Sequence, residues 1–187
     1  MTETMAREAV WIGALGLPGE LVLPAHCAAV VVFAHGSGSS RLSPRNRRVA
    51  AAIVAGGIGT LLFDLLTVAE ERRDRLDASL RFDIGLLTER LAGATRWLDA
   101  QDWARSLTRG YFGASTGAAA ALTASIECKV SAIVSRGGRP DLAGQRCVRR
   151  DDGHLASFDR GHATAPPKAA CASARSSASR PAYRGEK

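Results

Sequence analysis

The sequence has few cysteines, and they lie far apart. None of the four belongs to a CxxC pair or to a dense cluster: Cys27, Cys128, Cys147 and Cys171. Zinc sites and disulfide-rich secreted domains both need cysteines at short, regular spacings. The pattern therefore predicts neither a metal site nor a disulfide framework, and we expect a reducing, cytoplasmic location.

Long apolar runs are also lacking. No run approaches the roughly 18 residues of a membrane-spanning helix. The first ten residues carry Glu3, Arg7 and Glu8 where an export signal would have an apolar core. The sequence thus predicts no export signal and no membrane partner.

Aromatic residues make up only 5% of the chain, but 46% of its residues are hydrophobic, with many alanines and glycines. This composition favours a packed α/β protein over a wholly disordered chain. The formal net charge of +7 is uneven, since residues 1–145 hold 16 basic and 14 acidic residues and residues 146–187 hold 9 and 4. We therefore expect a folded domain over residues 1–145 and a basic, disordered tail over residues 146–187, in which no strand is predicted.

Apolar runs and amphipathic segments alternate along the first part, as in parallel sheets covered by helices. Residues 10–23 predict an antiparallel hairpin or meander at the edge of the sheet. Continuous apolar runs at 28–34 and 58–63 predict buried strands, and shorter strands are expected at 108–112 and 130–135. Ser43 and Pro44 predict the start of a helix that ends at Gly56 and Gly57, and apolar residues spaced three or four apart predict another from Leu80 to Leu98.

The main motif is G-x-S-x-G, formed by Gly113, Ser115 and Gly117. It falls between a predicted strand and a predicted alanine-rich helix, which is the context of a nucleophile elbow. The glycines permit a sharp turn that exposes the serine hydroxyl, and the helix amino terminus places partial positive charge near a developing oxyanion. The other interpretation is a tight turn with a serine that faces solvent.

A second motif, His35-Gly36-Ser37-Gly38, follows the first buried strand. Such a loop is able to aim a backbone N–H at the oxygen that the Thr116 N–H would bind, which would complete an oxyanion hole. A phosphate cradle is the alternative, but the spacing fits neither the Walker pattern nor the dinucleotide fingerprint. We interpret His35 as a structural residue that orders the loop, not as a catalytic base.

Several segments in the same order resemble the dienelactone hydrolase-like branch of the α/β-hydrolase superfamily. They are AVVVFAHGSGSSRLSPRNRRVA, GTLLFDLLT, FDIGLLTERL, YFGASTGAAAAL and AIVSRGGRPDLAG, and the resemblance spans roughly residues 8–145. It implies a doubly wound, mostly parallel sheet and hydrolysis of esters or lactones, without a cofactor. Carried over, Ser115 would be the nucleophile, the N–H groups of Thr116 and Ser37 the oxyanion hole, and Gly113 and Gly117 the elbow.

Two departures limit the resemblance. Dienelactone hydrolases carry cysteine at the elbow, so the serine points to shared fold ancestry and not to dienelactone as a substrate. The family also continues with strands that supply the catalytic acid and base, and those strands are not recognisable here. The order serine, acid, histidine is met formally by Ser115, Asp141 and either His154 or His162. The favoured interpretation is nevertheless that Asp141 is a turn residue and that the histidines are solvated tail residues.

Three functions remain after the sequence analysis. The first is a serine hydrolase for small esters or lactones, with activity impaired by the missing acid and base. The second is a catalytically inactive remnant or small-molecule binding module. The third, nucleic-acid binding by the basic tail, is the least favoured because the tail lacks aromatic residues at regular intervals, and we expect no nucleic-acid partner. A sheet without its last strands would expose an edge, which predicts self-association.

Overall fold

The computed structural model describes residues 6–138, 142 and 154–158 of the 187-residue chain. Its strands are β1 (Ala6–Ile12), β2 (Leu17–Leu23), β3 (Ala29–Ala34), β4 (Gly59–Phe63), β5 (Thr108–Ala114), β6 (Ala132–Arg136) and β7 (His154–Phe158). Its helices are α1 (Pro44–Ala55), α2 (Val68–Asp77), α3 (Ile84–Asp99) and α4 (Thr116–Ala124), with short 3-10 helices at Leu80–Phe82 and Asp102–Ala104. None of these helices, within the described ranges, is long and apolar enough to cross a membrane.

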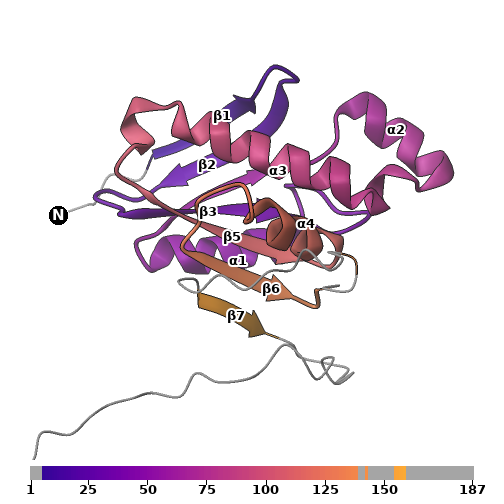
Figure 1. Cartoon of the computed structure of the whole chain (residues 1–187). Helices are drawn as coiled ribbons and strands as arrows, with labels where there is room; N and C mark the ends of the chain where they lie inside the picture. The colour runs from indigo at the N-terminus through magenta and orange to yellow at the C-terminus, as the bar shows by residue number, and fades with distance from the viewer. Residues whose placement is uncertain (1–5, 139–141, 143–153, 159–187) are drawn as a thin grey trace, which may run out of the picture.

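The strands form one sheet in the order β1-β2-β4-β3-β5-β6-β7 (Figure 1). The β1 and β2 strands form the predicted antiparallel hairpin, and β2 pairs antiparallel with β4. All remaining pairs are parallel. The predicted α/β class with a mostly parallel, doubly wound sheet is therefore confirmed.

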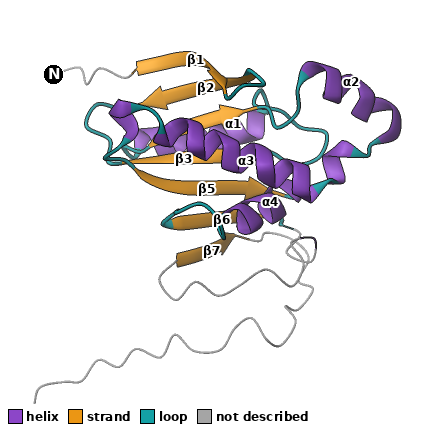
Figure 2. Ribbon diagram, turned by 45° about the horizontal axis from the view of Figure 1, so that its top comes forward, coloured by secondary structure: helices purple, strands orange, loops and turns teal. Residues whose placement is uncertain are grey.

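Helices cover both faces of the sheet, with α3 and α4 on one face and α1 on the other (Figures 1 and 2). The β3 strand shows why its sequence is continuously apolar. Val30 and Val32 belong to the core cluster beneath α3 and α4, whereas Phe33 belongs to the cluster beneath α1. Because successive side chains of a strand point to opposite faces, a strand buried on both faces needs an unbroken apolar run.

The strand order places a switch point between β3 and β5. The chain passes from β3 through α1 to β4 on one side, and returns through α2 and α3 to β5 on the other. In register, Ala34 at the end of β3 lies level with Gly113 in β5. The loops that leave these two strands therefore diverge and open a crevice at the carboxyl edge of the sheet, where open α/β sheets bind ligands.

Helix caps explain one confirmed boundary and one missed helix. The Ser43 side chain accepts a hydrogen bond from the Asn46 N–H, with Pro44 in the first turn of α1, as predicted. Helix α2 lies in a densely charged stretch for which the sequence analysis predicted no helix. The Thr67 hydroxyl accepts from the Glu70 N–H, while the Glu70 carboxylate accepts from the Thr67 N–H. This capping box, readable as T-x-x-E, was the available signal.

Strand β7 lies within residues 146–187, where the sequence analysis expected a disordered tail. His154–Phe158 pairs in parallel with Ala132–Arg136 of β6 and becomes one edge of the sheet. The segment has no strong alternation of apolar and polar residues. Its pairing depends on backbone N–H and C=O groups of β6 that would otherwise be unpaired. The expected disorder of the tail concerns residues outside the described ranges, and self-association through a sheet edge stays a prediction.

A buried hydrogen bond joins the sheet to α3. The Tyr111 hydroxyl lies 2.6 Å from Thr95 Oγ1, which donates to the Leu91 carbonyl, so Tyr111 is the donor of the shared bond. We expect Tyr111→Phe to lower the free energy of unfolding at pH 7 by about 1 kcal/mol, the usual net value of such a bond. Urea denaturation measures the difference. Burial raises the pKa of Tyr111, so its contribution is present below about pH 10 and is lost at higher pH as the unfolded phenol ionises.

Candidate functional site

The turn between β5 and α4 has the geometry of a nucleophile elbow. Ser115 has φ 51° and ψ −121°, in the left-handed half of backbone space that non-glycine residues rarely occupy. Its N–H donates to the Arg136 carbonyl at 3.2 Å, and its own carbonyl accepts from the Ala118 N–H at 3.0 Å. The backbone is therefore held in a conformation that costs about 1–3 kcal/mol and persists only because the surrounding contacts enforce it.

The two flanking glycines are required by close backbone contacts. A Cβ on Gly113 would lie 2.7 Å from the Gly117 carbonyl oxygen and closer still to Ala118 Cα. A Cβ on Gly117 would collide with the carbonyl oxygens of Ala34 and His35 at the end of β3. Helix α4 can approach β3 this closely only because Gly117 has no side chain, which gives the motif its spacing.

The loop after β3 packs directly against the elbow. A Cβ on Gly36 would lie 3.1 Å from Ser115 Cβ and 3.0 Å from the Ala114 carbonyl oxygen. Ser37, which follows Gly36, and Thr116, which opens α4, both line one cavity at this edge. The structure thus brings together the loop and the elbow that the sequence analysis expected to cooperate.

His35 is a structural residue, as its sequence context indicated. Its Nε2 accepts a hydrogen bond from the buried Leu65 N–H at 3.1 Å, and its Nδ1 lies 3.1 Å from the Gly36 carbonyl oxygen. The ring is therefore neutral, with Nδ1 as the donor. Burial lowers its pKa below the ordinary value, although the Gly36 carbonyl and the charge of Asp64 oppose this. His35 ties the end of β3 to the segment after β4 and has no nitrogen left to act as a base.

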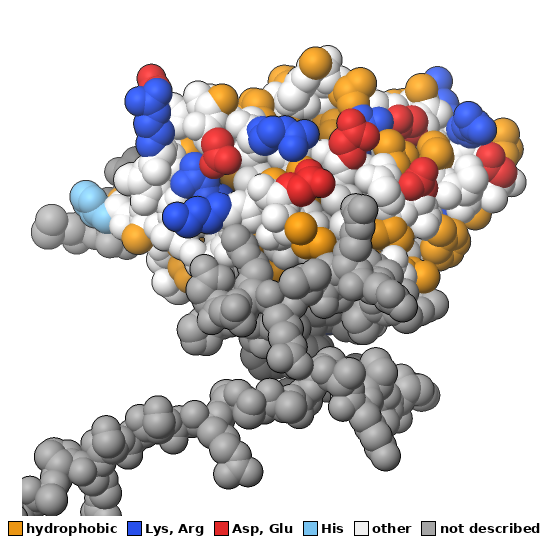
Figure 3. Space-filling model, viewed as in Figure 1, with side chains coloured by type: hydrophobic (Ala, Val, Ile, Leu, Met, Phe, Trp, Pro, Cys, Tyr) orange, Lys and Arg blue, Asp and Glu red, His pale blue; other side chains and the backbone are white. Residues whose placement is uncertain are grey.

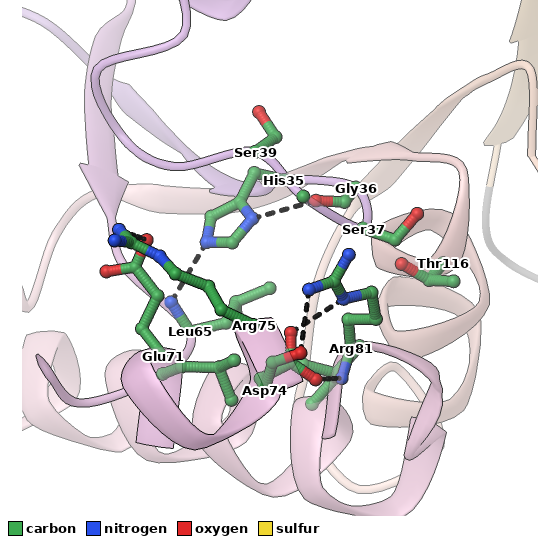
Figure 4. A pocket seen from close by; sticks show the side chains of 13 residues that line it. His35, Gly36, Ser37, Ser39, Leu65, Glu71, Asp74, Arg75, Arg81 and Thr116 are labelled. Carbon is green, nitrogen blue, oxygen red and sulfur yellow. Dashed lines mark hydrogen bonds and ion pairs between the residues drawn. The ribbon is translucent and has the colours of Figure 1, made fainter. Parts of the chain in front are cut away.

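A cavity beside the elbow, lined by Thr116 and not by Ser115 itself, has a volume of about 330 Å³ (Figure 4). Most of its wall is polar or charged, and only three leucines supply apolar side chains. The lining residues are His35, Gly36, Ser37, Gly38, Ser39, Leu65, Leu66, Glu71, Asp74, Arg75, Arg81, Leu87 and Thr116. A cavity of this size admits a small molecule.

Asp74 and Arg81 form an ion pair in the cavity wall that the sequence analysis did not single out. Asp74 is 3% exposed and accepts from the Arg81 backbone N–H at 2.9 Å and from Arg81 Nε at 2.7 Å. Arg81 also donates to the Asp74 carbonyl at 2.8 Å. Burial alone would raise the pKa of Asp74, but the hydrogen bonds and positive charge of Arg81 outweigh it and hold the pKa below its ordinary value. In sequence the two residues belong to a charged stretch that reads as a solvated surface.

The residues proposed as acid and base are not assembled at the elbow by the described part of the chain. Asp141 and His162 lie outside the described residues. His154 is the first residue of β7 and lies level with Ala132, whereas Ala114, next to the elbow, lies level with Arg136. His154 therefore begins its strand at the amino edge of the parallel strands, opposite the elbow, and this position does not favour the role of base.

Surface charge around α3 is mixed. Acidic and basic side chains are interspersed on the face drawn in Figure 3. Residues of α3 and its neighbours form ion pairs, such as Arg90 with Glu70 at 2.7 Å and Arg109 with Asp99 at 2.8 Å. Nucleic-acid binding proteins present basic side chains clustered on one face. This face has no such cluster.

The contact at Gly117 gives a direct test of the elbow. We expect Gly117→Ala to lower the free energy of unfolding by about 3 kcal/mol or more, because the added methyl group has only backbone atoms to displace. Gly93→Ala is the matched control, since a Cβ at this position in α3 meets only the end of the Arg96 side chain, at 4.0 Å. That control should gain up to about 1 kcal/mol from helix propensity. Equal effects of the two changes in denaturant titrations would contradict the packing described.

The Asp74–Arg81 ion pair is expected to make a contribution to the free energy of unfolding that depends on pH. We expect Asp74→Asn to lower the free energy of unfolding at pH 7 by about 1.5–3 kcal/mol, the range for hydrogen bonds to a charged group. The pKa of Asp74 is lowered in the fold, so its contribution is complete above its ordinary value of 3.8 and is lost as pH falls through the folded-state value. Urea titrations of both proteins between pH 7 and pH 3 should show a constant difference in the free energy of unfolding, which becomes smaller only below about pH 4. A difference in the free energy of unfolding that already becomes smaller between pH 6 and pH 5 would argue against this ion pair.

Comparison with known proteins agrees with the fold. No protein-family model matches the chain. A dienelactone hydrolase from Anabaena variabilis is 52% identical, with a TM-score of 0.71 over 76% of this chain and 67% of that protein. An esterase from Pyrococcus furiosus, 18% identical, shares the fold, with a TM-score of 0.53 over 73% of this chain and 53% of that protein.

Two curated sequences from strains of Mycobacterium tuberculosis, each named "Putative phosphoribosyl transferase", are 54% identical over 134 residues. The match covers 71% of this chain, which spans only 29% of the length of those relatives. The Anabaena enzyme is similar over two thirds of its own length, in fold as well as in sequence. On that match the chain belongs to the dienelactone hydrolase-like branch of the α/β-hydrolase superfamily.

Proposed function

We propose that this chain is a serine hydrolase of carboxylic esters or lactones, with Ser115 as its nucleophile. The observation that carries the proposal is the backbone of Ser115, which holds φ 51° between two glycines that tolerate no side chain. Strain of this kind persists where it serves a site. A tight turn with an ordinary solvent-facing serine would need neither that strain nor those contacts.

The oxyanion hole would be formed by backbone N–H groups of Thr116 and Ser37. Thr116 is the first residue of α4, so its N–H belongs to the first turn, where helices leave their donors unpaired. The positive end of the helix dipole lies at the same place. Ser37 belongs to the loop that packs against Ser115 through Gly36. Donors fixed in this way stabilise negative charge that develops on a carbonyl oxygen.

In the proposed reaction, Ser115 Oγ forms a bond to the carbonyl carbon of the ester, and the bond from that carbon to the alcohol oxygen breaks. The hydroxyl proton of Ser115 ends on the released alcohol. Water then attacks the acyl-enzyme, releases the carboxylic acid and returns a proton to Ser115. An activated serine normally needs a histidine and an acid for these proton transfers.

We further propose that the activity is impaired. Within the described residues, no histidine is placed to serve Ser115. His35 uses both ring nitrogens in structural contacts, whereas His26 precedes β3 and His154 begins β7, both at the opposite edge of the sheet. A catalytically inactive module that keeps the cavity is therefore the second candidate. No observation on the described residues favours phosphoribosyl transfer, and the relatives that carry that name are much longer chains.

Covalent labelling tests the nucleophile. We expect the folded protein to form one adduct with a fluorophosphonate probe, seen by intact-mass spectrometry, because the probe reacts only with an activated serine. Ser115→Ala should form none. Ser39→Ala is the matched control, since Ser39 lines the same cavity without a proposed role, and it should label like the wild type.

The rate of p-nitrophenyl acetate hydrolysis, measured in the same three proteins, should follow the labelling. Labelling of the Ser115→Ala protein at the wild-type rate would overturn the nucleophile assignment. No adduct on a folded wild-type protein would favour the inactive module.

A further inference from the structure

Thr116 carries a buried hydroxyl with no hydrogen-bond partner among the described residues. The residue is 1% exposed, and its Oγ1 is fully covered and unpaired. A threonine within a helix usually satisfies this group by donating to a carbonyl one turn earlier, as Thr95 does to Leu91 and Thr123 does to Ala119. Thr116 cannot do so, because the chain turns sharply before α4.

This hydroxyl belongs to a residue in the wall of the cavity. Thr116 follows Ser115 directly and lines the cavity together with Ser37 and Arg81. Figure 4 draws its oxygen on the side of Ser37 and Arg81, not on the side of the helix core. A polar group that is buried in the empty fold without a partner is destabilising, and natural folds keep few of them without a reason.

We propose that the Thr116 side chain contacts the substrate by donating a hydrogen bond from Oγ1 to an oxygen of the bound ester. The inference rests on the proposed function and extends it. Thr116 would then supply two donors, its N–H to the oxyanion hole and its hydroxyl to the same ester group. The hydroxyl gains its partner only when a ligand occupies the cavity.

Thr60 provides a matched control within the same chain. It is the second residue of the buried strand β4, is 0% exposed, and its Oγ1 is likewise unpaired among the described residues. It does not line the cavity beside the elbow. If the unpaired hydroxyl of Thr116 were only a packing defect, Thr60 and Thr116 would respond alike to loss of the hydroxyl.

The test compares Thr116→Val, Thr116→Ser and Thr60→Val with the wild type. Valine keeps the shape of threonine and the backbone N–H but removes the hydroxyl. We expect both valine variants to melt about 2–4 °C higher, since each removes an unpaired buried group. Only Thr116→Val should lose activity, with kcat/KM for p-nitrophenyl acetate about three- to tenfold lower, the effect of one hydrogen bond. Thr116→Ser should stay within about twofold of the wild type, because it restores the donor.

Unchanged kcat/KM in Thr116→Val, or an equal loss in Thr60→Val, would overturn the inference. A Thr116→Val protein that melts below the wild type would do the same, because the hydroxyl would then have a partner in the free protein.

Failure of the proposed function is recognised separately, as a wild type whose hydrolysis does not depend on Ser115. Binding of acetate, followed by NMR titration, then decides the inference. Weaker binding to Thr116→Val than to the wild type and Thr60→Val supports it, and equal binding or none overturns it.

Discussion

The contact between α4 and the end of β3 is the constraint on which the site depends. Gly117 lets the helix lie against the carbonyl groups of Ala34 and His35, and this approach fixes the direction in which the chain turns at Ser115. The same contact holds the loop after β3 against the elbow. The cavity, the first turn of α4 and the strained serine are therefore consequences of one close packing, which no larger residue at position 117 permits.

Much of this arrangement was predictable from the sequence. The unbroken apolar runs of β3 and β4, the Ser43–Pro44 cap and the G-x-S-x-G motif each report local requirements that the chain satisfies within a few residues. The loop after β3 was predictable as a partner of the elbow because parallel strands end at the same edge. The structural role of His35 also followed from its place beside a buried strand.

Other features depend on contacts between distant segments. The Asp74–Arg81 pair looks like part of a solvated charge run, since nothing local shows that Asp74 is buried. The strand at His154–Phe158 forms by pairing with β6, and its own residues carry little strand signal. The unpaired hydroxyl of Thr116 is likewise invisible in sequence, because only the packing around it shows that no hydrogen-bond partner among the described residues is in reach.

The strained backbone at Ser115 also bears on how this chain can change over evolutionary time. Glycine would adopt φ 51° without the steric cost that serine carries, so the fold alone favours the loss of the side chain at this position. Random substitution under selection for stability would move toward that relaxed turn. A lineage that retains serine in this conformation keeps a local cost that folding does not require, so position 115 would record whether chemistry at the cavity is still under selection.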